Sequence, residues 1–130
     1  MIEIATADEA QALASAVVAL TPARLADAFK GANQSMSGNG YQKLPGGLIM
    51  QWGRKSVGDF ANDYIGTIAF PIAFPNQIFQ VNVTLYSYNE ALFDASSAVT
   101  GHRLTGFDFT LQEWNSVTQN VDVTYIAIGY

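Results

Sequence analysis

The chain of 130 residues contains no cysteine and few charged side chains. The absence of cysteine excludes disulfide bridges and thiolate metal sites. Charged residues make up only 13% of the chain, and the formal net charge of -5 opposes sequence-independent attraction to nucleic acid or to anionic lipid surfaces. No apolar run approaches the roughly 20 residues that span a bilayer, and the N-terminus lacks the basic-then-apolar order of a signal peptide. Nucleic acid binding and membrane insertion are therefore not expected.

The first thirty residues predict two short helices. Thr6 and Glu9 have the spacing of a capping box, in which each side chain satisfies the backbone amide of the other residue. Thr21 and Pro22 form a second helix start, and Gly31 can end that helix. The stretch 31–47 is rich in glycine, asparagine and serine and indicates a linker. The expected organisation is a helical shaft segment over 1–36, a glycine-rich neck over 37–47 and a separate domain over 48–130.

Beyond the neck, apolar and polar residues alternate with a period of two, which is typical of strands. The five strands expected cover 48–52, 64–70, 79–86, 107–111 and 121–128. Turn-rich stretches at 54–62, 71–77, 87–103 and 112–120 separate them, which favours an antiparallel sandwich or barrel over a βαβ fold. The predicted fold class is therefore mainly β, an antiparallel β-sandwich preceded by a short α-helical segment. The alternation places Trp52 on the buried face of its strand and Tyr86 on the polar face of another.

Catalytic and metal chemistry have weak support. The carboxylates that lie in or near the turns could include a glycosidase pair, but such a pair needs a defined separation and an acidic domain carries many solvated carboxylates. These carboxylates are Asp59, Asp63, Asp94, Asp108 and Glu113. His102 is the only histidine and belongs to no nucleophile motif. As a metal ligand it would need copies from other chains on a shared axis. No catalytic residue, metal or cofactor is predicted.

Two groups of motifs resemble a known family. "EIATADEAQALASAVVALTPARLADAF", residues 3–29, resembles the short segment found in tail fibres of tailed phages. "GYQKLPGGLIMQWG", "FPIAFPNQIFQVNVT" and the final "IAIGY" resemble the C-terminal domain of those fibres, which prophages and phage-tail-like bacteriocins share. Leu13-Ala14-Ser15 replaces a Gly-Thr pair frequent in the family, which predicts a longer first helix.

The resemblance implies a homotrimer whose tip binds a bacterial surface receptor, commonly lipopolysaccharide or another glycan. It also implies a place in the virion, at the distal end of a tail fibre that is made in the host cytoplasm. The chain from Met1 would then be a piece of a longer fibre, with the rest of the fibre and a fibre assembly chaperone as partners. Apolar residues among 5–30 support assembly, because two short isolated helices are marginal in water. A glycan-cleaving depolymerase and a purely structural trimerisation cap remain alternatives.

An up-and-down strand order predicts where the receptor binds. The first, third and fifth strands would end on the same side, so loops 54–62 and 87–103 and Tyr130 are expected at the distal tip, with Gln112 and Gln119 on the shaft side. Amide and carboxylate groups bond sugar hydroxyls, tyrosine covers an apolar sugar face, and Arg or Lys can pair with phosphates. The predicted receptor-binding residues are Arg54, Lys55, Asp59, Asn62, Tyr86, Tyr88, Asn89, Asp94, His102 and Arg103.

Overall fold

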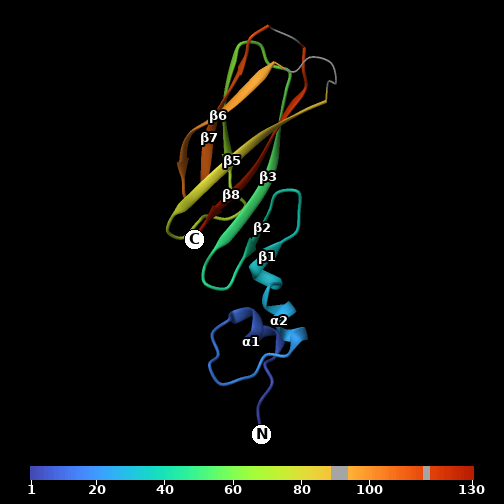
Figure 1. Cartoon of the computed structure of the whole chain (residues 1–130), viewed down its shortest axis with the longest axis vertical. Helices are drawn as coiled ribbons and strands as arrows, with labels where there is room; N and C mark the ends of the chain where they lie inside the picture. The colour runs from blue at the N-terminus through green and yellow to red at the C-terminus, as the bar shows by residue number, and fades with distance from the viewer. Residues whose placement is uncertain (89–93, 116–117) are drawn as a thin grey trace.

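The structure is a computed structural model that describes residues 1–88, 94–115 and 118–130. The molecule is elongated, with the N-terminal helices at one end and the strands stacked above them (Figure 1). The helical elements are α1 (Ala7–Ala12), α2 (Pro22–Ala28) and η1 (Gly31–Asn33). The strands are β1 (Gln34–Ser35), β2 (Gly40–Lys43), β3 (Ile49–Gly58), β4 (Asp63–Ala69), β5 (Ile78–Ser87), β6 (Ala95–Arg103), β7 (Gly106–Glu113) and β8 (Val121–Gly129).

The N-terminal unit confirms both predicted helix starts. The Thr6 backbone amide donates to the Glu9 carboxylate at 2.8 Å, and the Glu9 amide donates back to the Thr6 hydroxyl at 3.3 Å. Pro22 opens α2, while the Thr21 hydroxyl accepts from the Arg24 amide. The prediction of a longer first helix is wrong. It ends after Ala12, because Leu13 adopts a left-handed conformation with φ of 52°.

Two antiparallel sheets form the rest of the molecule, which confirms the mainly β class. One sheet has the order β1-β2-β3-β8-β5 and the other the order β4-β7-β6. Their inner faces share one core that includes Phe107, Phe109, Val123 and Tyr125. The rings of Phe107 and Tyr125, one from each sheet, lie 5.1 Å apart in an edge-to-face arrangement. The five strands predicted from alternation are present as β3, β4, β5, β7 and β8.

Strand β6 is the element that the sequence reading missed. Its residues, ASSAVTGHR, are mostly small and include one large apolar side chain, Val99, so the alternation of large apolar residues is absent. The extra strand reverses the direction of β7 and β8 relative to the prediction. Tyr130 therefore lies at the shaft side, where its backbone carbonyl accepts from the Asn76 and Gln77 amides, and the end of β7 and the start of β8 lie at the end farthest from the N-terminus (Figure 1). The predicted positions of Tyr130, Gln112 and Gln119 are wrong for this reason.

The glycine-rich stretch also contains strands. β1 and β2 form an antiparallel extension of the larger sheet, with Gly40 opposite Trp52. A Cβ atom on Gly40 would lie 2.8 Å from the Trp52 ring, so the close approach of β2 to that ring requires glycine. The neck is thus built partly into the sheet of the domain that follows it.

The predicted burial of Trp52 is also wrong, because β3 faces the core with its other parity. Gln51 is fully buried, and its side chain exchanges two hydrogen bonds with the backbone of Ile72, at 2.9 and 3.0 Å. A glutamine satisfied in this way occupies a core position that a hydropathy pattern assigns to the surface. Trp52 instead points to the outer face, and its indole N–H donates to the Ser37 carbonyl at 3.0 Å.

Candidate functional site

The predicted receptor-binding residues do not form one cluster. Arg54, Tyr86 and Tyr88 gather on the outer face of the larger sheet. Asp59, Asn62 and Asp94 lie at the end farthest from the N-terminus, and Asn89 is outside the described residues. Lys55 lies on β3 of the larger sheet. His102 and Arg103 lie at the end of β6 in the smaller sheet, which is the shaft side and not the predicted distal tip.

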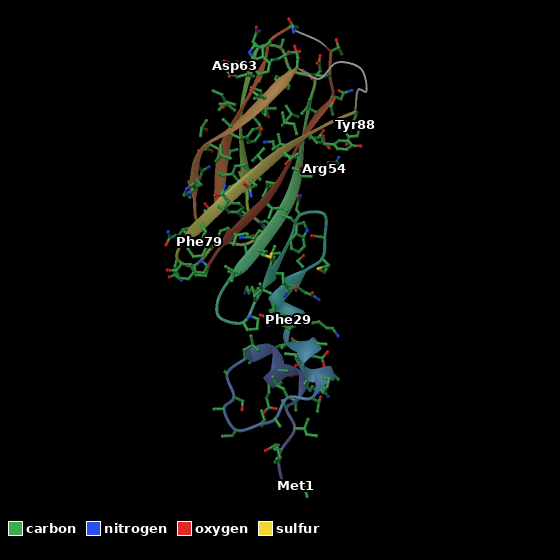
Figure 2. All side chains as sticks on the ribbon, in the orientation of Figure 1. Met1, Phe29, Arg54, Asp63, Phe79 and Tyr88 are labelled. Carbon is green, nitrogen blue, oxygen red and sulfur yellow. The ribbon has the colours of Figure 1, made fainter. Side chains whose placement is uncertain are left out.

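Strand register explains the first group. β8 lies between β3 and β5, with Asp122 opposite Ser56 on one side and opposite Tyr86 on the other. Side chains two residues apart on a strand share a face, so Arg54, Tyr86 and Tyr88 project on the same side as Asp122. We call these four residues the outer-face cluster. Figure 2 shows the Arg54 and Tyr88 side chains close together at the side of the sandwich.

In the outer-face cluster, two tyrosine rings lie beside one guanidinium group. The guanidinium carbon of Arg54 lies 4.8 Å from the ring centre of Tyr86 and 5.7 Å from that of Tyr88, within the range of cation–π attraction. The two tyrosine rings meet edge to face, 5.0 Å apart. Tyr86 and Tyr88 remain 50% and 55% exposed, so both rings can contact a ligand.

Asp122 holds Tyr88 and Arg54 in position from the buried side of the cluster. Its side chain is buried and accepts from the Tyr88 hydroxyl at 2.8 Å, and it forms an ion pair with the Arg54 Nε. Burial alone would raise the pKa of Asp122, but the hydrogen bonds from Tyr88 and Ser56 and the charge of Arg54 outweigh burial and lower the pKa. The same hydrogen bond, together with burial, raises the pKa of Tyr88. The charge of Arg54 is therefore compensated within the cluster.

Sequence reasoning missed Asp122. The signal that could have found it is a carboxylate inside the apolar run of the last predicted strand, because a charge in such a strand needs a partner. That partner is supplied by β3 and β5, which are distant in sequence from β8.

The carboxylates of the far end hold loops together. Asp59 accepts from the Gln119 amide at 2.8 Å, and Asp94 accepts from the Asn115 amide at 2.8 Å and from the Gln119 side chain at 3.1 Å. Glu113 accepts from the same Gln119 side chain at 3.2 Å, and Gln119 is fully buried. Asn62 is an exposed turn residue with φ of 66°. Asp59 and Asp94 thus stabilise the segments that precede and follow the neighbouring strands by hydrogen bonds.

The remaining predicted residues make separate contacts. Arg103 forms a two-point ion pair with Asp108, at 2.8 and 3.0 Å, on adjacent strands of the smaller sheet. The hydrogen bonds from Arg103 and from Thr67 lower the pKa of Asp108 to about 2. The Lys55 ammonium donates to the Thr67 carbonyl at 3.0 Å and so joins the two sheets at their edge. His102 is exposed on β6.

Two further properties concern the part of the chain that the structure describes. No group of three or more acidic or histidine side chains within residues 1–88, 94–115 and 118–130 is placed to hold a metal ion. Neither described helix has the length and apolar character needed to cross a membrane.

Comparisons with known proteins identify the family. The sequence model of one protein family, described as the C-terminal domain of the gp53-like tail fiber protein, matches residues 43–130. The N-truncated R1-type pyocin tail fiber is similar in structure, with 29% identity and a TM-score of 0.69 over 86% of this chain and 98% of that chain. A longer fragment of the Pseudomonas aeruginosa R1 pyocin fiber matches equally well, and this chain spans 32% of its length. The R2-type fiber, at 22% identity and a TM-score of 0.58, shares the fold.

A sequence relative comes from a different organism. The uncharacterized protein MJ0347 of Methanocaldococcus jannaschii is 29% identical over 107 residues, which cover 80% of this chain and 69% of the relative. The family match covers more than half of the chain and includes every strand from β3 to β8. The chain therefore belongs to the gp53-like tail fibre C-terminal family and is a component of a virion or phage-tail-like particle.

Proposed function

We propose that this chain is the receptor-binding tip of a homotrimeric tail fibre, and that it attaches to a bacterial surface glycan, such as the saccharide of lipopolysaccharide, without cleaving it. The observation that carries the proposal is the outer-face cluster, where two half-exposed tyrosine rings flank Arg54 on the larger sheet. Tyrosine rings cover the apolar face of a sugar, and guanidinium and hydroxyl groups bond its hydroxyls.

The bonding of the far-end carboxylates favours adhesion over cleavage. A glycosidase needs one carboxylic acid to donate a proton and a second carboxylate to attack or to activate water. Asp59 and Asp94 instead accept hydrogen bonds from backbone amides of their own chain. A depolymerase therefore remains the weaker alternative, and a structural trimerisation cap is the other.

The trimer is proposed from the exposed apolar residues of the N-terminal unit. Ile2, Val17 and Leu25 are 79%, 85% and 51% exposed. Contact between copies of the chain would remove these surfaces from water, which stabilises the assembly by the hydrophobic effect. Three tips on one axis would also multiply weak glycan contacts through avidity. In this proposal the tip lies at the distal end of the fibre and joins the rest of the fibre with the help of an assembly chaperone.

The proposal is tested with fluorescently labelled protein. Adsorption to a panel of bacterial strains, combined with sedimentation of the free protein, should give a trimer that binds at least one strain and releases no reducing sugar. Release of sugar would favour the depolymerase. A trimer that binds none of the strains would favour the structural cap, and a folded monomer would contradict the oligomeric state.

A further inference from the structure

A cavity of about 390 Å³ lies beside the outer-face cluster on the same sheet face. It is lined by Gly38, Trp52, Gly53, Arg54, Asn82, Thr84, Thr124, Tyr125 and Ile126. Its volume falls in the lower part of the range of about 300–1,000 Å³ that is typical of small-molecule pockets. Arg54 belongs to both the cavity and the outer-face cluster, so one extended ligand can occupy them together.

The walls of the cavity are fixed by hydrogen bonds. The Trp52 indole N–H is held by the Ser37 carbonyl, and the Arg54 backbone amide donates to the Asn39 side chain at 2.7 Å. Asn39 can approach this closely because Gly53 has no Cβ atom. A Cβ at that position would lie 2.6 Å from the Asn39 side-chain oxygen, too close for any other residue. The 36–39 connection is thus tied to β3 at two points. A pre-formed wall lowers the ordering cost of binding a ligand.

The chemistry of the walls matches a sugar ring. Trp52 and the half-exposed Ile126 supply apolar surface, and Asn82 and Thr84 supply an amide and a hydroxyl on the neighbouring strand. The Thr124 hydroxyl donates to the Thr84 carbonyl at 3.0 Å, which leaves its oxygen able to accept a further hydrogen bond. A sugar presents C–H groups on its faces and hydroxyls around its rim, so it can use both kinds of wall.

The charges that line the cavity indicate whether it binds a charged or an uncharged sugar. Arg54 is the charged residue among those that line the cavity, and its ion pair with the buried Asp122 compensates it. Asp122 engages the Arg54 Nε, so the pair carries no net charge, and a ligand phosphate or carboxylate at the guanidinium would lie close to a buried negative charge. The other arginine of the two sheets, Arg103, is paired with Asp108.

We infer that this cavity binds an uncharged sugar residue of the receptor glycan, a conclusion that rests on the proposed function. It differs from the expectation that arginine or lysine pairs with lipopolysaccharide phosphates. The ligand class is a neutral saccharide whose ring lies against Trp52 and whose hydroxyls bond Asn82 and Thr84.

The two tryptophans provide the test, because Trp52 lines the cavity and Trp114 lies exposed after β7. The chain is labelled with 5-fluorotryptophan, its two ¹⁹F signals are assigned with Trp114→Phe, and sugars are added one at a time. The probes are glucose, galactose, rhamnose and N-acetylglucosamine, with glucuronate and inorganic phosphate as charged counterparts. At least one neutral sugar should shift the Trp52 signal and leave Trp114 unchanged.

Asn82→Ala should weaken the binding of that neutral sugar about threefold to tenfold, which is the effect of one lost hydrogen bond. Thr100→Ala, an exposed change on the smaller sheet, is the matched control and should leave binding unchanged. Shifts caused by phosphate or glucuronate alone, or no Trp52 shift with any neutral sugar, would overturn the inference. If the labelled protein still adsorbs to bacteria in that case, the proposed function stands and only this ligand class fails.

Discussion

The hydroxyl of Tyr88 donates a 2.8 Å hydrogen bond to the carboxylate of Asp122, which is 3% exposed. This contact joins the residue that follows β5 to β8, which lies between β3 and β5, and positions the Tyr88 ring beside Arg54. The geometry of the outer-face cluster therefore depends on a carboxylate that a ligand would hardly touch.

Tyr88→Phe should lower stability at neutral pH, because Asp122 loses a hydrogen bond that lowers its pKa. A carboxyl group with a lowered pKa in the folded state contributes stability above its ordinary value near 3.8, and this contribution is lost as the pH falls. The urea midpoint of the variant should thus be below that of the wild type at pH 7, and the difference should shrink toward pH 3. Tyr86→Phe serves as the control. Equal midpoints at pH 7, or a difference that grows on acidification, would contradict the role of this contact.

Gln51→Leu should destabilise the protein although it adds apolar character to a core position. The substitution leaves the backbone N–H and carbonyl of Ile72 without their partners, at a cost of about 2–4 kcal/mol in the free energy of unfolding. Gln112→Leu, at an exposed position on β7, should change that free energy by less than about 0.5 kcal/mol. Urea titrations of both variants measure the difference. A Gln51→Leu protein as stable as the wild type would show that the loop at Ile72 rearranges without cost.

Tyr125→Phe should be neutral or stabilising at pH 7, by up to about 1 kcal/mol. The hydroxyl of Tyr125 is buried and has no hydrogen-bond partner within the described residues, and burial raises its pKa to about 12. The unfolded chain loses this proton near pH 10, so the wild type should lose stability as the pH rises from about 10 to about 12. Thermal unfolding across this range should show a smaller loss in the variant. Marked destabilisation at pH 7 would reveal a missing partner for the hydroxyl.

Local patterns predicted the local parts of this fold. The capping box at Thr6 and Glu9 and the alternation of Phe107, Phe109 and Leu111 depend on neighbours in sequence, and both are present as expected. Strand β6 was missed because its small residues carry little hydropathy contrast. That single omission reversed the last two strands and placed Tyr130 at the wrong end.

The candidate site could be predicted only in its residue types. Arg54, Tyr86 and Tyr88 are predicted to contact the receptor, but local patterns carry no information on the register between their strands. The placement of β8 between β3 and β5 creates the cluster and brings in Asp122. Asp59 and Asp94 lie at the end of the molecule farthest from the N-terminus, where the backbone amides of Gln119 and Asn115 donate hydrogen bonds to them.

The central claim is that the receptor binds the outer face of the larger sheet and not the connections at the far end. The most direct measurement compares adsorption of labelled Tyr86→Ala and Trp114→Ala trimers to a strain that the wild type binds. The two aromatic side chains are 50% and 67% exposed, so each can be removed at little cost to folding, and sedimentation checks the trimer. The account predicts that Tyr86→Ala weakens adsorption about tenfold or more, since avidity amplifies a loss at each tip, while Trp114→Ala adsorbs like the wild type. Loss of adsorption in Trp114→Ala with full adsorption in Tyr86→Ala would contradict the account, as would a Tyr86→Ala protein that no longer forms trimers.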